Sequence, residues 1–178
     1  MAIEAIRRQL LVAAVLLCLA ACRTGTPDLT GFTEEEPPRL SPSISTSDPG
    51  TAAQLVSGWE PNEGNPWRWT NPRFSAVLRP PPGSSTLGAI LQFHFSLPEV
   101  EMSRLKELTL SASVQGFRLA PETYRAVGEA VYVREVPAAV LSGDSVRVDF
   151  TLDKSFVPGN GDPRALGVIA KRLGLETK

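Results

Sequence analysis

Residues 58–73, GWEPNEGNPWRWTNPR, concentrate the residue types best suited to binding a sugar. All three tryptophans of the chain lie here, together with two glutamates and two arginines. A tryptophan face stacks on the apolar side of a sugar ring, while carboxylates and guanidinium groups hydrogen bond to its hydroxyls. The same residues could instead close a small β-domain. Packing explains Trp59, Glu60 and Arg68 least, and we assign ligand binding to these three.

The chain offers little for catalysis. Its single histidine, His94, is the only base available for a Ser-His-Asp triad, and no Gly-x-Ser-x-Gly elbow accompanies it. Glu60 and Glu63 could serve as glycosidase carboxylates, but they stand three residues apart beside a proline. No phosphate loop or dinucleotide fingerprint is present. We therefore predict that the protein is not an enzyme and uses no cofactor.

Metal and nucleic-acid binding are also disfavoured. One histidine cannot build a His-rich metal site, and the two cysteines, Cys18 and Cys22, stand together near the N-terminus. We predict no metal site. The chain has 18 basic and 19 acidic residues, with a formal net charge of −1, and the basic residues are interleaved with acids. Nucleic-acid binders usually show a clustered basic face, so we expect no nucleic-acid partner.

The N-terminus has the pattern of an export signal. Arg7 and Arg8 precede an uninterrupted apolar run over residues 10–21. That run is too short to span a bilayer, which needs about 20 apolar residues, but it fits the apolar region of a secretory signal peptide. We assign residues 1–21 to the signal peptide.

The run ends in Leu19-Ala20-Ala21-Cys22, which resembles the lipobox of bacterial lipoproteins. The resemblance implies cleavage before Cys22, a diacylglyceryl group on its thiol and a further acyl chain, such as palmitate, on the new N-terminus. Each buried methylene contributes about 0.8 kcal/mol, so several chains anchor durably. Arg23 follows instead of the aspartate that resembles an inner-membrane retention signal. This favours the outer membrane of a two-membrane cell envelope. The alternative is an ordinary signal peptide with an incidental cysteine.

After the cysteine the composition changes twice. Residues 22–50 are rich in Pro, Ser, Thr, Gly and acids, have almost no apolar periodicity, and are predicted to form a disordered tether. Residues 51–178 show period-two alternation typical of half-buried strands. The alternating segments are 74–79, 87–97, 108–115, 131–134 and 146–152.

These strands predict an all-β fold. Turn signals rich in Pro, Gly, Asn and Asp separate them, which indicates a jelly-roll-like antiparallel β-sandwich. We expect Leu87 to belong to the core face of its strand, residues 99–107 to form a loop, and residues 167–175 to form a closing strand. Val131 and Val133 are assigned to the core face of theirs.

A pair of motifs stands at the two ends of the domain, GWEPNEGNPWRWT and GDPRALGV. It resembles small β-sandwich domains in bacterial envelope and polysaccharide-related proteins, often beside membrane glycosyltransferase segments. The resemblance implies a glycan context. The matching positions are Gly58, Trp59, Glu63, Arg68, Trp69, Asp162, Arg164, Leu166 and Gly167. Glu60 departs from the pattern, because an aromatic is common there.

Structural roles for these residues compete with binding. Trp67 and Trp69 alternate on one strand face and would pack into the sandwich. Arg164 could pair with Glu63, Asp162 could cap its turn, and Gly167 would allow a close backbone approach. We assign Glu63, Trp69, Asp162, Arg164 and Gly167 to this structural motif.

A second polar surface is a weaker candidate. Tyr132, Arg134, Arg147 and Asp149 are expected to share one polar sheet face, with His94 on the polar face of its own strand. A concave polar face could hold a glycan, but a solvated surface is the simpler interpretation.

Two hypotheses for function follow. The first is a lipid-anchored envelope protein whose sandwich binds carbohydrate without catalysis. The second is a structural or assembly lipoprotein that docks to an envelope protein partner through an exposed apolar patch or strand edge.

Overall fold

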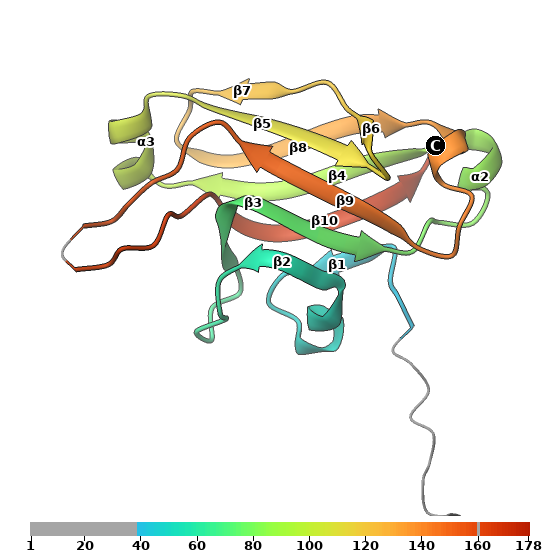
Figure 1. Cartoon of the computed structure of the whole chain (residues 1–178), viewed down its shortest axis with the longest axis horizontal. Coiled ribbons are helices and arrows are strands. Elements are labelled where there is room, and N and C mark those ends of the chain that lie inside the picture. Colours follow the sequence, from blue (N-terminus) through green and yellow to red (C-terminus); the bar gives the residue numbers. More distant parts are fainter. Residues whose placement is uncertain (1–38, 160) are drawn as a thin grey trace, which may run out of the picture. The chain divides into compact units, whose positions relative to one another are not determined.

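The computed structural model describes residues 39–159 and 161–178 (Figure 1). The predicted signal peptide, the lipidation site at Cys22 and most of the tether lie outside these residues. No helix in the described part of the chain is long and apolar enough to span a membrane.

The described fold is an antiparallel β-sandwich, as predicted (Figure 1). One sheet has the strand order β1 (Ser43–Ser45), β10 (Ile169–Thr177), β4 (Ala89–Leu97), β8 (Gly128–Val136). The other has the order β2 (Leu55–Trp59), β3 (Arg68–Leu78), β9 (Val146–Leu152), β5 (Leu108–Val114), with β6 (Phe117–Arg118) and β7 (Glu122–Tyr124) beside β5. The short helical elements are η2 (Pro49–Gln54), α2 (Ser84–Leu87), α3 (Glu99–Leu105) and η3 (Ala138–Val140).

The chain passes back and forth between the two sheets, which gives the jelly-roll-like connectivity. The strands β3, β5 and β9 belong to one sheet, and β4, β8 and β10 to the other. The strand β3 also joins the sheets at one corner. Its first two residues pair with β10, and the stretch from Arg73 onward pairs with β9. This corner positions the tryptophan-rich segment.

The core fills the space between the sheets because alternate residues of each strand point inward. In β4 every odd-numbered residue from Ala89 to Leu97 is buried. Phe74, Phe93 and Phe150 bring three strands into contact, with centroid distances of 4.8 Å between Phe74 and Phe150 and 5.0 Å between Phe93 and Phe150. The predicted closing strand is confirmed as β10, which lies beside β4 and pairs with β1.

Ordered structure begins before residue 51, where we expected the domain to start. The strand β1 pairs with β10 and places Ile44 in the core. The side chain of Gln54 accepts a hydrogen bond from the Ser41 backbone N–H at 2.8 Å and donates to the Val77 carbonyl at 2.8 Å. This segment is held by hydrogen bonds and one apolar anchor, so its sequence shows almost no apolar periodicity.

Two local predictions are wrong. Leu87 ends the short helix α2 and is exposed, because Gly88 turns the chain before β4 begins. Residues 99–105 form the helix α3 where we expected a loop. Pro98 occupies its N-cap, where a missing N–H costs nothing, and buried Met102 anchors the helix to the core.

The strand β8 has the opposite phase to the one predicted. Tyr132 is fully buried, while Val131 and Val133 are 39% and 44% exposed. The Tyr132 hydroxyl donates to the Ala120 carbonyl at 2.8 Å, so its polar end is satisfied inside. Arg134 lies over the Tyr132 ring at 4.5 Å.

The predicted shared polar face is therefore wrong as well. Tyr132 and Arg134 take the inner side of β8, in one sheet. Arg147 and Asp149 lie on the outer side of β9, in the other sheet, where they form an ion pair at 2.8 Å. The four residues do not share one face.

Candidate functional site

Two segments far apart in the sequence meet at the corner of the sandwich. The first is loop 60–67, which links β2 to β3 and is closed at its base by a hydrogen bond from the Glu60 N–H to the Trp69 carbonyl at 2.9 Å. The second is the connection from β9 to β10, residues 153–168, which we call the arm (Figure 1). Phe156 and Leu166 pair across the arm as an antiparallel bridge.

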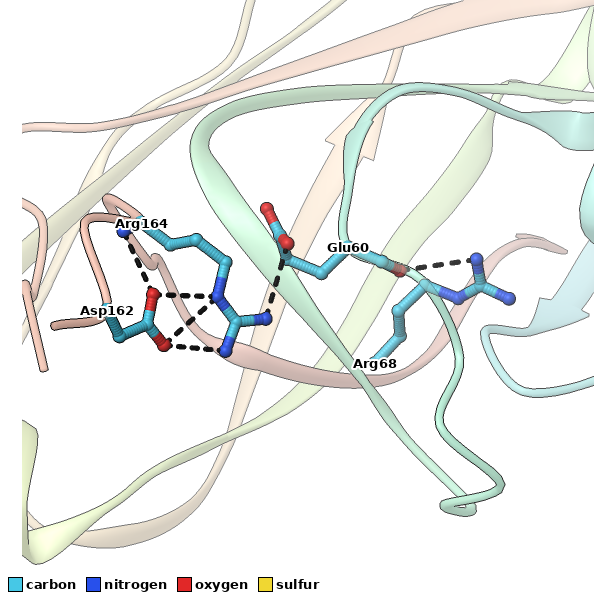
Figure 2. Close-up of polar contacts among 4 residues, drawn as sticks. All are labelled: Glu60, Arg68, Asp162 and Arg164. Atoms are coloured by element: carbon cyan, nitrogen blue, oxygen red, sulfur yellow. Dashed lines mark hydrogen bonds and ion pairs between the residues drawn. The ribbon is translucent and has the colours of Figure 1, made fainter.

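An arginine of the arm joins the two segments. Arg164 donates from Nη2 to Asp162 Oδ2 at 2.7 Å and from Nη1 to Glu60 Oε2 at 3.5 Å. Its Nε and its backbone N–H both reach Asp162 Oδ1 at 3.0 Å. Figure 2 shows Arg164 between the two carboxylates. The pairing that we expected with Glu63 is made with Glu60 instead.

The charges of this cluster reinforce one another. Hydrogen bonds from Arg164 lower the pKa of Asp162 below its usual value. The same hydrogen bonds raise the pKa of Arg164, with a smaller contribution from Glu60. Both groups therefore stay ionised at neutral pH. A carboxyl whose pKa is lowered is a poor general acid.

Arg68 lies on the opposite side of Glu60 from Arg164 (Figure 2). Its Nε donates to the Thr46 carbonyl at 3.0 Å, and its Nη1 donates to the Glu60 carbonyl at 3.3 Å. These bonds fasten loop 60–67 to the turn after β1. A role for Arg68 in ligand binding stays a prediction.

Trp59 has the contacts of a packing residue. Its Nε1 donates to the Ser75 carbonyl at 2.8 Å, and its ring meets the Phe74 ring edge-on at 5.1 Å. The side chain is half-buried against the core. The indole N–H is therefore already used within the fold, while binding by Trp59 stays untested.

The other two tryptophans lie at the surface, where we expected them to pack into the sandwich. Trp67 and Trp69 are half-buried and meet edge-to-face, with a centroid distance of 6.3 Å and an interplanar angle of 86°. The inward position belongs to Thr70, whose Oγ1 accepts from the Val168 N–H at 3.0 Å. Because side chains alternate along a strand, Trp69 faces outward.

The tryptophan pair borders a small crevice of about 60 Å³. Its lining includes Glu60, Glu63, Trp67, Arg68, Trp69 and Arg164. A larger hollow of about 660 Å³ adjoins it, and Glu60 and Arg164 line both. The other residues of the larger hollow are Asn71, Pro72, Arg73, Leu152 and Ala165. We call the two together the ion-pair hollow, because the Glu60–Arg164 pair separates its parts.

Two motif glycines hold the walls of this hollow together. Gly58 has φ +75°, and a Cβ there would collide with the Arg73 carbonyl oxygen and lie 2.7 Å from the Phe74 Cα. A Cβ at Gly167 would lie 2.7 Å from Leu152 Cδ1 and 2.8 Å from the Asn71 carbonyl oxygen. Only glycine lets β2 and the arm approach β3 this closely.

The hollow offers binding groups but no evident reaction chemistry. His94 contacts Gln92 on β4, with 3.2 Å between Nε2 and Oε1, and does not line the hollow. Within residues 39–159 and 161–178, no three His, Cys, Asp or Glu side chains cluster as metal ligands. The hollow does present aromatic rings, carboxylates, guanidinium groups and an amide. The absence of enzymatic activity stays a prediction.

Sequence reasoning missed Asn71 and Arg73 as lining residues. They follow the Arg-Trp-Thr motif on β3 at positions that alternate with Thr70, and they face the same side as Trp69. The available signal was the continuation of the strand past Pro72. Pro72 weakens that signal, because proline is common at strand edges and rare in central strands.

Comparison with known proteins gives a distant likeness in fold. No family model and no curated protein matches the sequence. The CBM36-1 domain of a multidomain xylanase from the hindgut metagenome of Trinervitermes trinervoides is similar over 76% of this chain and 96% of that one, with 10% identity and a TM-score of 0.44. An acetyl xylan esterase from the rumen bacterium Butyrivibrio proteoclasticus has 11% identity and a TM-score of 0.46, over 76% of this chain and 33% of that one.

A third similar structure contains the CBM51-2 domain of a Clostridium perfringens protein, in complex with GlcNAc. It has 15% identity and a TM-score of 0.33, over 76% of this chain and 28% of that one. The CBM36 and CBM51 domains are carbohydrate-binding modules. Because all these TM-scores lie below 0.5, we base the proposed function on the residues of this chain alone.

Proposed function

We propose that this protein binds carbohydrate at the ion-pair hollow without catalysing a reaction on it. One observation carries the proposal: the paired rings of Trp67 and Trp69 lie at the surface, directly beside the ion pair of Glu60 and Arg164. Aromatic faces with adjacent charged hydrogen-bonding groups suit a sugar ring, which has an apolar face and a rim of hydroxyls.

The contacts around the hollow suit a binding site that is formed in advance. Arg164 is held by Asp162, and loop 60–67 is held by Arg68 and by a hydrogen bond from Asn62 to the Ser47 carbonyl at 3.2 Å. A rigid site loses little entropy when ligand binds. Glu60 Oε1 has no partner among the described residues and remains available to accept a hydrogen bond from a hydroxyl.

A glycan array that includes bacterial envelope polysaccharides tests this proposal, with the full chain purified in mild detergent. We expect binding to at least one glycan, with a loss of tenfold or more in Trp67→Ala and Trp69→Ala. Phe117→Ala is the matched control, because Phe117 is an exposed aromatic on β6 that does not line the hollow. If no glycan binds, or if the tryptophan variants bind as wild type, the proposal fails.

We further propose that Cys22 carries the lipid anchor and places the domain at the cell envelope, on the outer membrane where the host has two membranes. The lipobox sequence, the charged start and the short apolar run support this. Labelling in cells with a palmitate analogue should be abolished by Cys22→Ser and retained by Cys18→Ser. Labelling that survives Cys22→Ser would exclude the anchor.

The second candidate function is docking to an envelope protein partner, and the edge strand β8 favours it. This nine-residue strand ends its sheet and exposes Val131 and Val133. Exposed apolar residues on a strand edge are a common feature of strand-addition sites. A photocrosslinker at Val133 should capture one stoichiometric partner in cells if this function is correct, and none if it is not.

A further inference from the structure

The larger part of the ion-pair hollow has room for more than one sugar ring. Its volume of about 660 Å³ lies within the range of roughly 300–1,000 Å³ typical of pockets for drug-sized ligands. The crevice beside the tryptophans has only about 60 Å³. A sugar that enters the crevice beside the tryptophans would therefore extend past the Glu60–Arg164 pair into the larger space.

The two parts of the hollow differ in charge. Arg164 is neutralised by Asp162 and Glu60 and has few donors left for a ligand anion. Arg73 is exposed on β3 and makes no hydrogen bond or ion pair through its side chain with any residue that the structure describes. Its guanidinium fork suits a bidentate contact with a carboxylate.

The position of Arg73 is fixed by the fold. Its backbone pairs with Thr151 of β9, and its carbonyl packs against Gly58. Asn71 stands two residues earlier on the same side of β3, and its side chain has no hydrogen bond within the described part of the chain. The two side chains together offer a charged fork and an amide in the larger part of the hollow.

The crevice beside the tryptophans has no excess of positive charge. The carboxylates of Glu60 and Glu63 line it together with Arg68 and Arg164, whereas the lining of the larger part has Glu60 with Arg73 and Arg164. A carboxylated sugar is therefore better placed in the larger part, and a neutral ring can stack and hydrogen bond in the crevice.

We propose that the ligand is an acidic oligosaccharide of at least two residues, with a neutral sugar beside Trp67 and Glu60 and a uronic acid bound by Arg73. This inference rests on the proposed function, because it deepens the specificity of the same hollow.

The experiment uses uronate-containing oligosaccharides, each matched with its carboxyl-reduced form, and the full chain in mild detergent. The wild type should bind at least one acidic member tenfold or more tightly than its reduced partner, with a preference that weakens as salt is raised. Arg73→Gln should remove the preference while retaining binding to the reduced form, and Arg73→Lys should restore part of it. Arg79→Gln, an exposed arginine just after β3, should change nothing.

The outcomes separate the two proposals. Equal binding of acidic and reduced forms, or a preference that survives Arg73→Gln, would overturn the acidic subsite. If the Trp67→Ala variant still loses binding in that case, the carbohydrate-binding function stands. Failure of every glycan to bind would overturn both.

Discussion

Burial of Glu101 should make the stability of this domain fall as pH rises. Glu101 lies in α3, its side chain is fully buried, and neither carboxylate oxygen has a hydrogen-bond partner among residues 39–159 and 161–178. Desolvation disfavours the charged form and raises the pKa of this carboxyl from its ordinary 4.5 to about 8. The folded protein therefore keeps Glu101 neutral at pH 7.

The direction and size of this pH dependence follow from proton linkage. Below pH 4.5 both folded and unfolded states hold the proton, so Glu101 contributes no slope. Between pH 4.5 and about 8 only the unfolded state releases it, and the free energy of unfolding falls as pH rises. At about 1.4 kcal/mol per pH unit, the accumulated loss above pH 8 is at most roughly 5 kcal/mol. That is a large part of the roughly 5–15 kcal/mol typical of a domain.

Urea denaturation at pH 4.5, 6, 7.5 and 9 measures this loss. Glu101→Gln is neutral at every pH, so wild type and variant should be similar at pH 4.5 and diverge by several kcal/mol at pH 9. Glu99→Gln is the matched control, because Glu99 is exposed in the first turn of the same helix. Parallel stability curves for wild type and Glu101→Gln would refute the reasoning.

Two further changes probe residues that adjoin the lining of the hollow. Gly167→Ala should destabilise the fold by about 2 kcal/mol or more, because its Cβ would press on Leu152 and on the Asn71 carbonyl oxygen. Gly143→Ala should cost less, because a Cβ there would make only ordinary contacts, the nearest at 3.4 Å from the Ser145 carbonyl oxygen. Equal midpoints in thermal denaturation would contradict this. Trp59→Phe should lower the free energy of unfolding by about 1 kcal/mol, because it loses the hydrogen bond to the Ser75 carbonyl, and it should retain glycan binding. Lost glycan binding with an unchanged free energy of unfolding would instead make Trp59 a ligand residue.

The fold was predictable where one physical signal dominates. The strands β4, β5 and β9 bury one face each, so apolar and polar residues alternate in their sequences, with Ile90 of β4 as the one exception. The core-facing side of β8 was predicted wrongly, because valine is more apolar than tyrosine and the valines were therefore assigned to the core. The Tyr132 hydroxyl finds the Ala120 carbonyl inside, while the valines lie at a sheet edge. Tertiary hydrogen bonds of this kind leave no periodic trace in a sequence.

The candidate site was predictable in part. The sequence indicated that the Gly-Trp and Asp-x-Arg motifs belong together, and Arg164 does reach loop 60–67. It could not indicate the partner, since Glu60 and Glu63 are chemically equivalent and only the path of the loop selects Glu60. Nor could it show that Thr70 takes the inward position and leaves Trp69 outside, because that depends on the bond to Val168.

The indole N–H signals of the three tryptophans provide the most direct test of carbohydrate binding at the ion-pair hollow. In ¹H–¹⁵N spectra of the full chain, titration with a glycan that binds should shift the signals of Trp67 and Trp69, which border the hollow. The signal of Trp59 should stay in place, because its N–H is bonded to the Ser75 carbonyl within the fold. A shift confined to Trp59, or binding that moves none of the three, would contradict the account.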